Sequence, residues 1–288
     1  MKAIIFGSNG QDGYYLHQLL NKEKIETIGV SRKGNWLIGN VGDWKFVEEI
    51  VKREKPAYIF HLAANSTTRH EALFENHETI CSGTLYILEA VKLHSPATKV
   101  FISGSGLQFE NKGLPIKETD PFEAGSPYAF SRIHSTYAAR YYRKLGIQAY
   151  VGYFFNHESP RRTERHVSRM ISEACRRIHL GSTEKIELGD TSVRKEWTYA
   201  GDVVEGIWKL CNQDHIMETV IGSGKAYSIE NWLEVCFNII GRDWKEYTRI
   251  KPQFTPEYRV LVSDPSTLQK LGWQDQVDLE QLAQLMMA

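Results

Sequence analysis

Short apolar runs alternate with amphipathic stretches along the first half of the chain. The apolar runs occupy residues 2–6, 26–31, 57–63, 99–105 and 148–155, and helix-like stretches occupy residues 14–24, 83–94 and 126–145. Strand-like runs that alternate with helical patterns are typical of a parallel sheet whose strands are joined by crossover helices. The pattern therefore predicts an α/β fold with a doubly wound parallel sheet.

The pattern changes after Asn156. Residues 157–169 are charged and irregular, and the later segments mix helical stretches with isolated strands. We therefore expect one domain over residues 1–155 and a smaller, mixed region over residues 156–288. The stretch TYAGDVVEGIWKLC indicates that the chain returns to the first domain at about residues 190–215.

The first apolar run ends in a glycine-rich turn, FGSNGQDG. Gly7, Gly10 and Gly13 lie directly after the predicted strand and at the start of the predicted helix. Glycine permits the tight turn and lets backbone N–H groups approach a pyrophosphate at the positive end of a helix. The turn therefore predicts a Rossmann-like dinucleotide-binding domain over residues 1–155, although many glycine turns bind no ligand.

The end of the second strand bears on which nicotinamide cofactor fits. An acidic residue at this position binds the 2′-hydroxyl of NAD, but the sequence here is VSRKG. Arg32 and Lys33 are cations suited to a 2′-phosphate, so we expect NADP rather than NAD. The alternative is that the two side chains belong to a solvated charged loop.

Composition and charge exclude several classes of function. Lys and Arg number 35, as do Asp and Glu, so no general basic field attracts nucleic acid or an anionic membrane. No apolar run is long enough to span a bilayer, and the N-terminus lacks the pattern of a signal peptide. The four cysteines are scattered without a CxxC pair, which predicts reduced thiols in a cytoplasmic protein and neither a disulfide framework nor a metal site.

The segment SPYAFSR combines a phenol with a cation. Tyr128 and Arg132 are separated by one helical turn after a Ser-Pro that resembles a helix start, so their side chains share a face. A neighbouring cation favours the phenolate form of a tyrosine. Tyr128 is therefore a candidate catalytic residue, and a serine, Ser105, lies at the end of a predicted strand. The alternative for Tyr128 is an aromatic side chain packed on an amphipathic helix.

Six segments spread over nearly the whole chain carry a family resemblance. They are GSNGQDGYYL, FHLAANS, KETDPFEAGSPYA, FFNHESPRR, KEWTYAGDVVEGIW and SDPSTLQKLGW. Together they resemble the extended short-chain dehydrogenase/reductases that act on nucleotide sugars, and in particular the GDP-mannose 4,6-dehydratase branch. NHESPRR is the most specific of the six.

The resemblance implies a set of binding residues and a catalytic group. For NADP they are Gly7, Ser8, Asn9, Gly10, Gln11, Asp12, Gly13, Arg32, Lys33, Asn40, Val41, Leu62, Ala63, Ala64, Asn65, Ser66, His157 and Arg162. For a nucleotide-diphospho-sugar, expected to be GDP-linked, they are Asn156, Arg169, Arg194, Lys195 and Arg259. The catalytic group would be Ser105, Tyr128 and Arg132: the tyrosinate removes the proton of the sugar 4-hydroxyl, the serine orients that oxygen, and NADP takes the hydride.

The sequence departs from the family pattern at several positions. Arg132 stands where the family has lysine, and Asn40 where it usually has aspartate. Leu107 stands where the dehydratases carry the glutamate that serves the elimination, and neither Gln108 nor Glu110 is an obvious substitute. Met170 replaces a lysine of the phosphate site. The loop SRKGNWLIGN is also shorter than the loop through which the dehydratases form tetramers, so we expect a homodimer formed by the long helices.

Three hypotheses follow from these observations. The first is an NADP-dependent dehydratase that acts on a GDP-linked sugar. The second keeps hydride transfer at C4 but omits the elimination, which describes a 4-keto-sugar reductase or an epimerase. The third is a protein that binds NADP or a sugar nucleotide without catalysis.

Overall fold

The computed structural model describes residues 1–288, and its largest element is a seven-stranded sheet. The strand order is β11-β6-β5-β4-β1-β2-β3, and every neighbouring pair is parallel. The strands are β1 (Lys2–Phe6), β2 (Glu26–Ser31), β3 (Leu37–Ile38), β4 (Tyr58–His61), β5 (Lys99–Ser105), β6 (Ala149–Phe154) and β11 (Glu218–Ile221). The predicted doubly wound parallel sheet is thereby confirmed.

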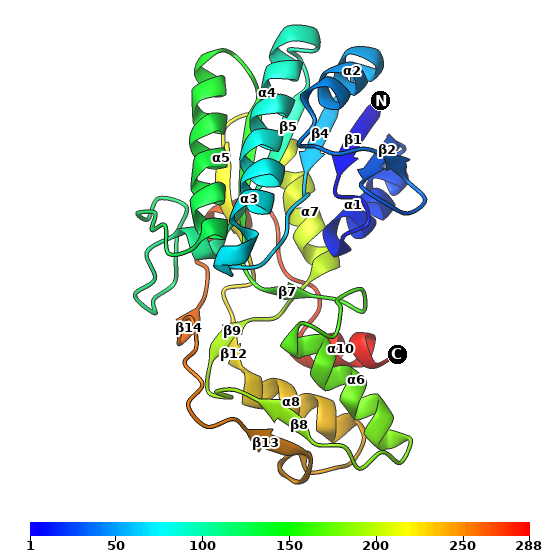
Figure 1. Ribbon diagram of the computed structural model, residues 1–288, viewed down its shortest axis with the longest axis vertical. Coiled ribbons are helices and arrows are strands. Elements are labelled where there is room, and N and C mark those ends of the chain that lie inside the picture. Colours follow the sequence, from blue (N-terminus) through cyan, green and yellow to red (C-terminus); the bar gives the residue numbers. More distant parts are fainter.

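Helices cover both faces of this sheet (Figure 1). Ile4 and Phe6 of β1 pack into one apolar cluster and Ala3 and Ile5 into another, because successive side chains of a strand point to opposite faces. The first cluster includes side chains of α2 (Trp44–Glu54), α4 (Gly83–His94) and α5 (Pro127–Lys144). The second includes side chains of α1 (Gln11–Lys22) and α7 (Ala200–Cys211). Burial on both faces explains why the strands read as continuous apolar runs.

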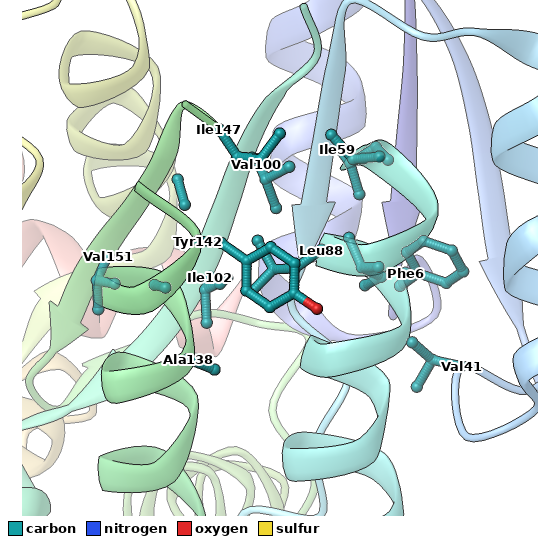
Figure 2. Close-up of a cluster of buried hydrophobic side chains, with 14 of the residues drawn as sticks. Phe6, Val41, Ile59, Leu88, Val100, Ile102, Ala138, Tyr142, Ile147 and Val151 are labelled. Atoms are coloured by element: carbon teal, nitrogen blue, oxygen red, sulfur yellow. The ribbon is translucent and has the colours of Figure 1, made fainter. Parts of the chain in front are cut away.

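Figure 2 shows the cluster between the sheet and helices α4 and α5. Val100 and Ile102 of β5 lie against Leu88 of α4 and against Ala138 and Tyr142 of α5. The Tyr142 hydroxyl reaches the edge of the cluster and donates to the Glu89 carboxylate at 2.7 Å. Each large apolar side chain buried in this way contributes about 1.5–3 kcal/mol. The cluster therefore holds α5, which carries Tyr128, firmly against the sheet.

Capping residues determine where two of these helices begin. Ser126 caps α5 by accepting from the N–H of Ala129 at 3.1 Å, and Pro127 occupies the first turn. Asp43 caps α2 in the same manner. Helix α2 was not predicted, although its buried Val47, Ile50 and Val51 have helical spacing.

Most of the elements that follow β6 form a second layer below the large sheet in Figure 1. It contains the sheets β12-β9-β14, β13-β8 and β10-β7, and a cluster in which Trp197 and Trp232 stack with ring centroids 4.8 Å apart. The elements are β7 (His157–Glu158), α6 (Val167–His179), β8 (Ile186–Leu188), β9 (Arg194–Glu196), β10 (Thr198–Tyr199), β12 (Ala226–Ser228), α8 (Ile229–Ile239), β13 (Thr248–Ile250), β14 (Val260–Leu261) and α10 (Leu279–Met287). Helix α9 (Ser266–Lys270) instead packs on the large sheet, where its Leu268 belongs to the same apolar cluster as α1 and α7.

The chain returns to the large sheet through α7 and β11. Helix α7 packs beside α1, and β11 pairs with β6 at the edge of the sheet. The segment between β4 and α4 forms η1 (His70–Ala72), α3 (Leu73–Asn76) and the π-helical turn η2 (His77–Ser82). None of the helices has the length and the apolar composition that a membrane-spanning helix needs. The division into a cofactor domain and a substrate region remains a prediction.

Candidate active site

A cleft of about 320 Å³ opens at the carboxyl ends of the central strands. Ligands of doubly wound sheets bind at this edge. The cleft brings together many of the predicted residues: Gly10, Gln11, Asp12, Leu62, Ala64, Ser66, Ser105, Tyr128, Arg132, Asn156, His157 and Arg162. It is also lined by residues that were not predicted to bind ligand: Thr68, Ser103, Leu107, Phe154, Phe155, His166 and Leu261.

The glycine turn after β1 has the form that a dinucleotide pyrophosphate requires. Gly7 has a φ of +100°, and a Cβ on it would lie 2.7 Å from the backbone nitrogen of Ala63. A Cβ on Gly13 would lie 2.5 Å from the carbonyl oxygen of Gly7. Gly10 begins α1 without any side-chain cap, so the positive end of the helix faces the cleft. These residues fit a nicotinamide dinucleotide.

Several other predicted cofactor residues lie around the turn but do not line the cleft. Ser8 is buried and donates to the carbonyl oxygen of Ile5, while Asn9 donates to the carbonyl oxygen of Lys33. Val41 belongs to the apolar core, and Asn40 donates to Glu78 at 2.8 Å. Arg32 and Asn65 both contact Glu75.

Ser105, Tyr128 and Arg132 meet where β5 ends beside the start of α5. The Ser105 hydroxyl oxygen accepts from the N–H of Leu107 at 3.2 Å. The carboxamide of Gln108 accepts from the N–H of Ser105 and donates to Thr136, so Gln108 is turned away from the cleft. Ser105 is thus held by its backbone, and its hydroxyl proton remains available to a ligand.

Arg132 is held beneath Tyr128 by β5. Its side chain is buried, and its Cζ lies 5.0 Å from the centroid of the Tyr128 ring. Its Nη1 donates to the carbonyl oxygen of Ser103 and, at 2.8 Å, to the hydroxyl of the same residue. That hydroxyl in turn donates to the carbonyl oxygen of His61 at 2.9 Å. The guanidinium is therefore directed toward the carboxyl end of β5. Ser103 is a positioning residue that the sequence pattern did not reveal.

A buried histidine lies next to this guanidinium. Neither ring nitrogen of His61 has a hydrogen-bond partner. Burial, with the Arg132 charge as a second cause, lowers the pKa of His61 to about 3. The imidazole is therefore neutral at physiological pH, and Arg132 is the charged group on this side of Tyr128.

An ion pair joins the glycine turn to β7. His157 Nε2 donates to Asp12 Oδ1 at 2.9 Å, and Nδ1 donates to the carbonyl oxygen of Phe155 at 2.7 Å. Since both ring nitrogens donate, His157 is an imidazolium. Burial opposes both charges, but the pair outweighs it: the pKa of Asp12 falls to about 2 and the pKa of His157 rises.

A second pocket, of about 340 Å³, lies next to the cleft. The segment after β7 separates the two: Arg162 and His166 line the cleft, whereas Arg165 lines the second pocket. The Tyr258 hydroxyl, from the second pocket, donates to Asn156 Oδ1 at 3.2 Å.

Of the predicted diphosphate ligands, Lys195 lines the second pocket and is buried beside Glu158. Arg169, Arg194 and Arg259 line neither pocket and have other partners. Arg169 contacts Glu173 and the carbonyl oxygen of Met286, Arg194 contacts the carbonyl oxygen of Ala226, and Arg259 contacts Asp190. Met170, which we expect to replace a lysine of the family, also lines the second pocket.

The cleft contains no free carboxylate near Ser105. Leu107 lines it, whereas Glu110 lies outside and pairs with Lys112 at 3.0 Å. Asp12 is the only acidic residue that lines the cleft, and its carboxylate is already paired with His157. His166 also lines the cleft, and burial together with Arg162 lowers its pKa to about 4, so its imidazole is neutral.

The ion pair between Asp12 and His157 predicts a pH-dependent stability. The raised pKa of His157 contributes stability below about pH 6.5, which is lost as pH rises through the folded value. The lowered pKa of Asp12 contributes stability that is complete above about pH 3.8, the ordinary pKa of an aspartate, and is lost as the pH falls through about 2. We expect His157→Gln to lower the free energy of unfolding by about 2 kcal/mol at pH 5 and by less at pH 9.

Urea denaturation across this pH range measures the difference. His94→Gln is the matched control, since it removes a histidine contact to Glu48 outside the site. A cost of His157→Gln that is the same at pH 5 and pH 9 would show that the pair is not ionised as described.

Comparisons with known proteins identify the family of this chain. Residues 30–286 match the family model for GDP-mannose 4,6 dehydratase. GDP-mannose 4,6 dehydratase 1 of Arabidopsis thaliana is 31% identical over 320 aligned residues, which cover 99% of this chain and 88% of the relative.

Two solved structures share the fold at 18% identity. The dTDP-glucose 4,6-dehydratase of Bacillus anthracis in complex with NAD has a TM-score of 0.87, over 100% of this chain and 95% of that one. RMD of Pseudomonas aeruginosa, complexed with NADPH, has a TM-score of 0.86, over 99% and 97%. By its sequence, the chain belongs to the GDP-mannose 4,6-dehydratase family of nucleotide-sugar enzymes.

Proposed function

We propose that this protein transfers a hydride between NADP and C4 of a GDP-linked sugar, as a 4-keto-sugar reductase or an epimerase that omits the elimination. The observation that carries the proposal is the single cleft in which Ser105, Tyr128 and Arg132 face the uncapped start of α1. The cleft has the groups that hydride transfer requires and lacks a free carboxylate for an elimination.

The residues have defined roles in this proposal. NADPH, when bound, supplies the hydride that reduces a C4 ketone to an alcohol. Tyr128 donates its hydroxyl proton to the sugar oxygen, and in the reverse direction its phenolate takes that proton back. Ser105 donates a hydrogen bond to the same oxygen. The Arg132 guanidinium lies beside the Tyr128 ring, with its Cζ 5.0 Å from the ring centroid, and keeps a positive charge next to the proton donor.

The two adjoining pockets support a nucleoside diphosphate sugar as substrate. The sugar would occupy the cleft beside Asn156, and the nucleoside would occupy the second pocket, where Phe254 offers an aromatic face. The segment between them carries Arg162 and Arg165, and Lys195 lies beside it, so cations flank the expected path of the diphosphate. The family match supports GDP as the nucleotide.

NADP is proposed over NAD because Arg32 and Lys33 follow β2 where NAD-binding domains carry an acid.

The four cysteines are buried and unpaired, which supports the predicted cytoplasmic location.

A second candidate is dehydration, which the family match favours. His166 is the one uncommitted proton-transfer group of the cleft apart from Tyr128, because its neutral imidazole has only a 3.5 Å contact to Arg162. In this candidate His166 would take the C5 proton and pass it to the departing C6 hydroxyl, which leaves as water.

Two substrates separate these candidates. We expect the protein to oxidise NADPH in the presence of a GDP-4-keto-6-deoxy sugar, and to remove no water from GDP-mannose with NADP by mass spectrometry. Tyr128→Phe should lower the rate at least about a hundredfold, because the proton donor is lost, while NADP binding is retained.

Other outcomes decide against reduction. Loss of water from GDP-mannose, abolished by His166→Asn, would establish the second candidate. Interconversion of epimers without consumption of NADPH would establish an epimerase. Binding of both ligands without turnover would identify a non-catalytic binding protein.

The absent acid can be restored by substitution. Leu107 is partly buried and lines the cleft close to Ser105, so Leu107→Glu places a carboxyl where partial burial favours its protonated form and suits it to proton transfer. We expect this variant to release water from GDP-mannose, as measured by mass spectrometry. Leu107→Gln, of equal size but without an acidic proton, should not. Equal activity in the two variants would contradict this role for the position.

The homodimer is proposed to form through α4 and α5, which pack side by side. Tyr137 and Tyr141 on α5 and Leu93 on α4 are all more than half exposed. We expect Tyr141→Glu to convert a dimer into a monomer in sedimentation velocity, because it would bury a charge in the interface. Leu180→Glu, at an exposed site after α6, is the control. A dimer that survives Tyr141→Glu would exclude this surface.

A further inference from the structure

Helix α3 carries a carboxylate that joins the ends of two strands on either side of the glycine turn. Glu75 Oε1 accepts from Arg32 Nη2 at 3.0 Å, and Oε2 accepts from Asn65 Nδ2 at 2.7 Å. Arg32 directly follows β2, and Asn65 lies in the segment after β4. Since β1 lies between β4 and β2 in the sheet, the bridge spans the strand at whose end the glycine turn begins.

The bridge engages the cation on which the NADP preference depends. Arg32 is the first basic residue after β2, where a 2′-phosphate would be bound. Its side chain is 62% exposed and that of Glu75 39%, so the ion pair contributes little to folding stability. Substitutions at either residue therefore leave the fold intact and report on ligand binding.

The Glu75 carboxylate is present at neutral pH. The hydrogen bond from Asn65, followed by the contact with Arg32, holds the pKa of Glu75 below its usual value. A phosphate monoester carries a charge of about −1.5 to −2, so a 2′-phosphate that approaches Arg32 also meets the negative charge of Glu75. A 2′-hydroxyl carries no charge, and a carboxylate accepts a hydrogen bond from it.

We infer that Glu75 is a specificity-determining residue of the cofactor site. By compensating the charge of Arg32, it weakens the binding of NADP and so reduces the difference in affinity between NADP and NAD. The inference rests on the proposed dinucleotide site and deepens it. In NAD-binding domains the acidic group near the ribose follows the second strand. In this protein the acidic group would instead come from α3.

Calorimetric titration of the full-length protein with NADP and with NAD, in the absence of sugar nucleotide, tests the inference. Glu75→Gln keeps an acceptor for Asn65 but removes the charge. We expect it to lower the Kd for NADP about tenfold and to change the Kd for NAD less than about threefold. In an Arg32→Gln background the gain for NADP should be smaller, because the released guanidinium is gone.

Glu71→Gln is the matched control, since it removes an exposed carboxylate from η1 in the same segment. Equal changes for both cofactors, an unchanged ratio of the two Kd values, or the same effect from Glu71→Gln would overturn the inference and leave the proposed function standing. Binding of neither cofactor to the unaltered protein would overturn both.

Discussion

The site depends on the buried ion pair between Asp12 and His157. Asp12 belongs to the first turn of α1, and His157 begins the strand that leads into the C-terminal layer. Gln11 strengthens this junction by accepting from the hydroxyl of Ser159 at 2.7 Å. The turn that would hold a pyrophosphate and the segment that would hold the sugar nucleotide are therefore fastened to each other. Removal of either charge would leave the other buried without compensation.

The same junction continues into a second group of charges. Glu158 follows His157 and is almost fully buried, with Arg162, Lys195 and Ser168 around it. The two cations outweigh the effect of burial and keep the pKa of Glu158 below its usual value. One carboxylate thus holds two cations beside the passage between the pockets. This arrangement keeps positive charge near the expected diphosphate position in a chain whose net charge is zero.

Arginine at position 132 changes what the catalytic cation can do. A lysine ammonium is a compact charge on a flexible stem, whereas the guanidinium is planar and presents several donors in a rigid arrangement. Here the Nη1 group of Arg132 donates to both the carbonyl oxygen and the hydroxyl of Ser103. The charge therefore stays near the Tyr128 ring, and the group is held toward the sheet edge. Family membership and altered chemistry are compatible, because a shared fold positions the residues while the side chains determine the reaction.

The sequence by itself determined the fold class, the glycine turn and the pairing of Tyr128 with Arg132, because each depends on spacing within one strand, turn or helix. The family resemblance also predicts that Leu107 stands in place of the glutamate of the dehydratases. Only the tertiary structure decided that Arg132 binds Ser103, that Glu110 lies outside the cleft and that Glu75 pairs with Arg32. It likewise directed Arg169, Arg194 and Arg259 away from both pockets. Those outcomes depend on contacts between residues that the sheet and its helices bring together from distant parts of the chain, and no local pattern encodes such contacts.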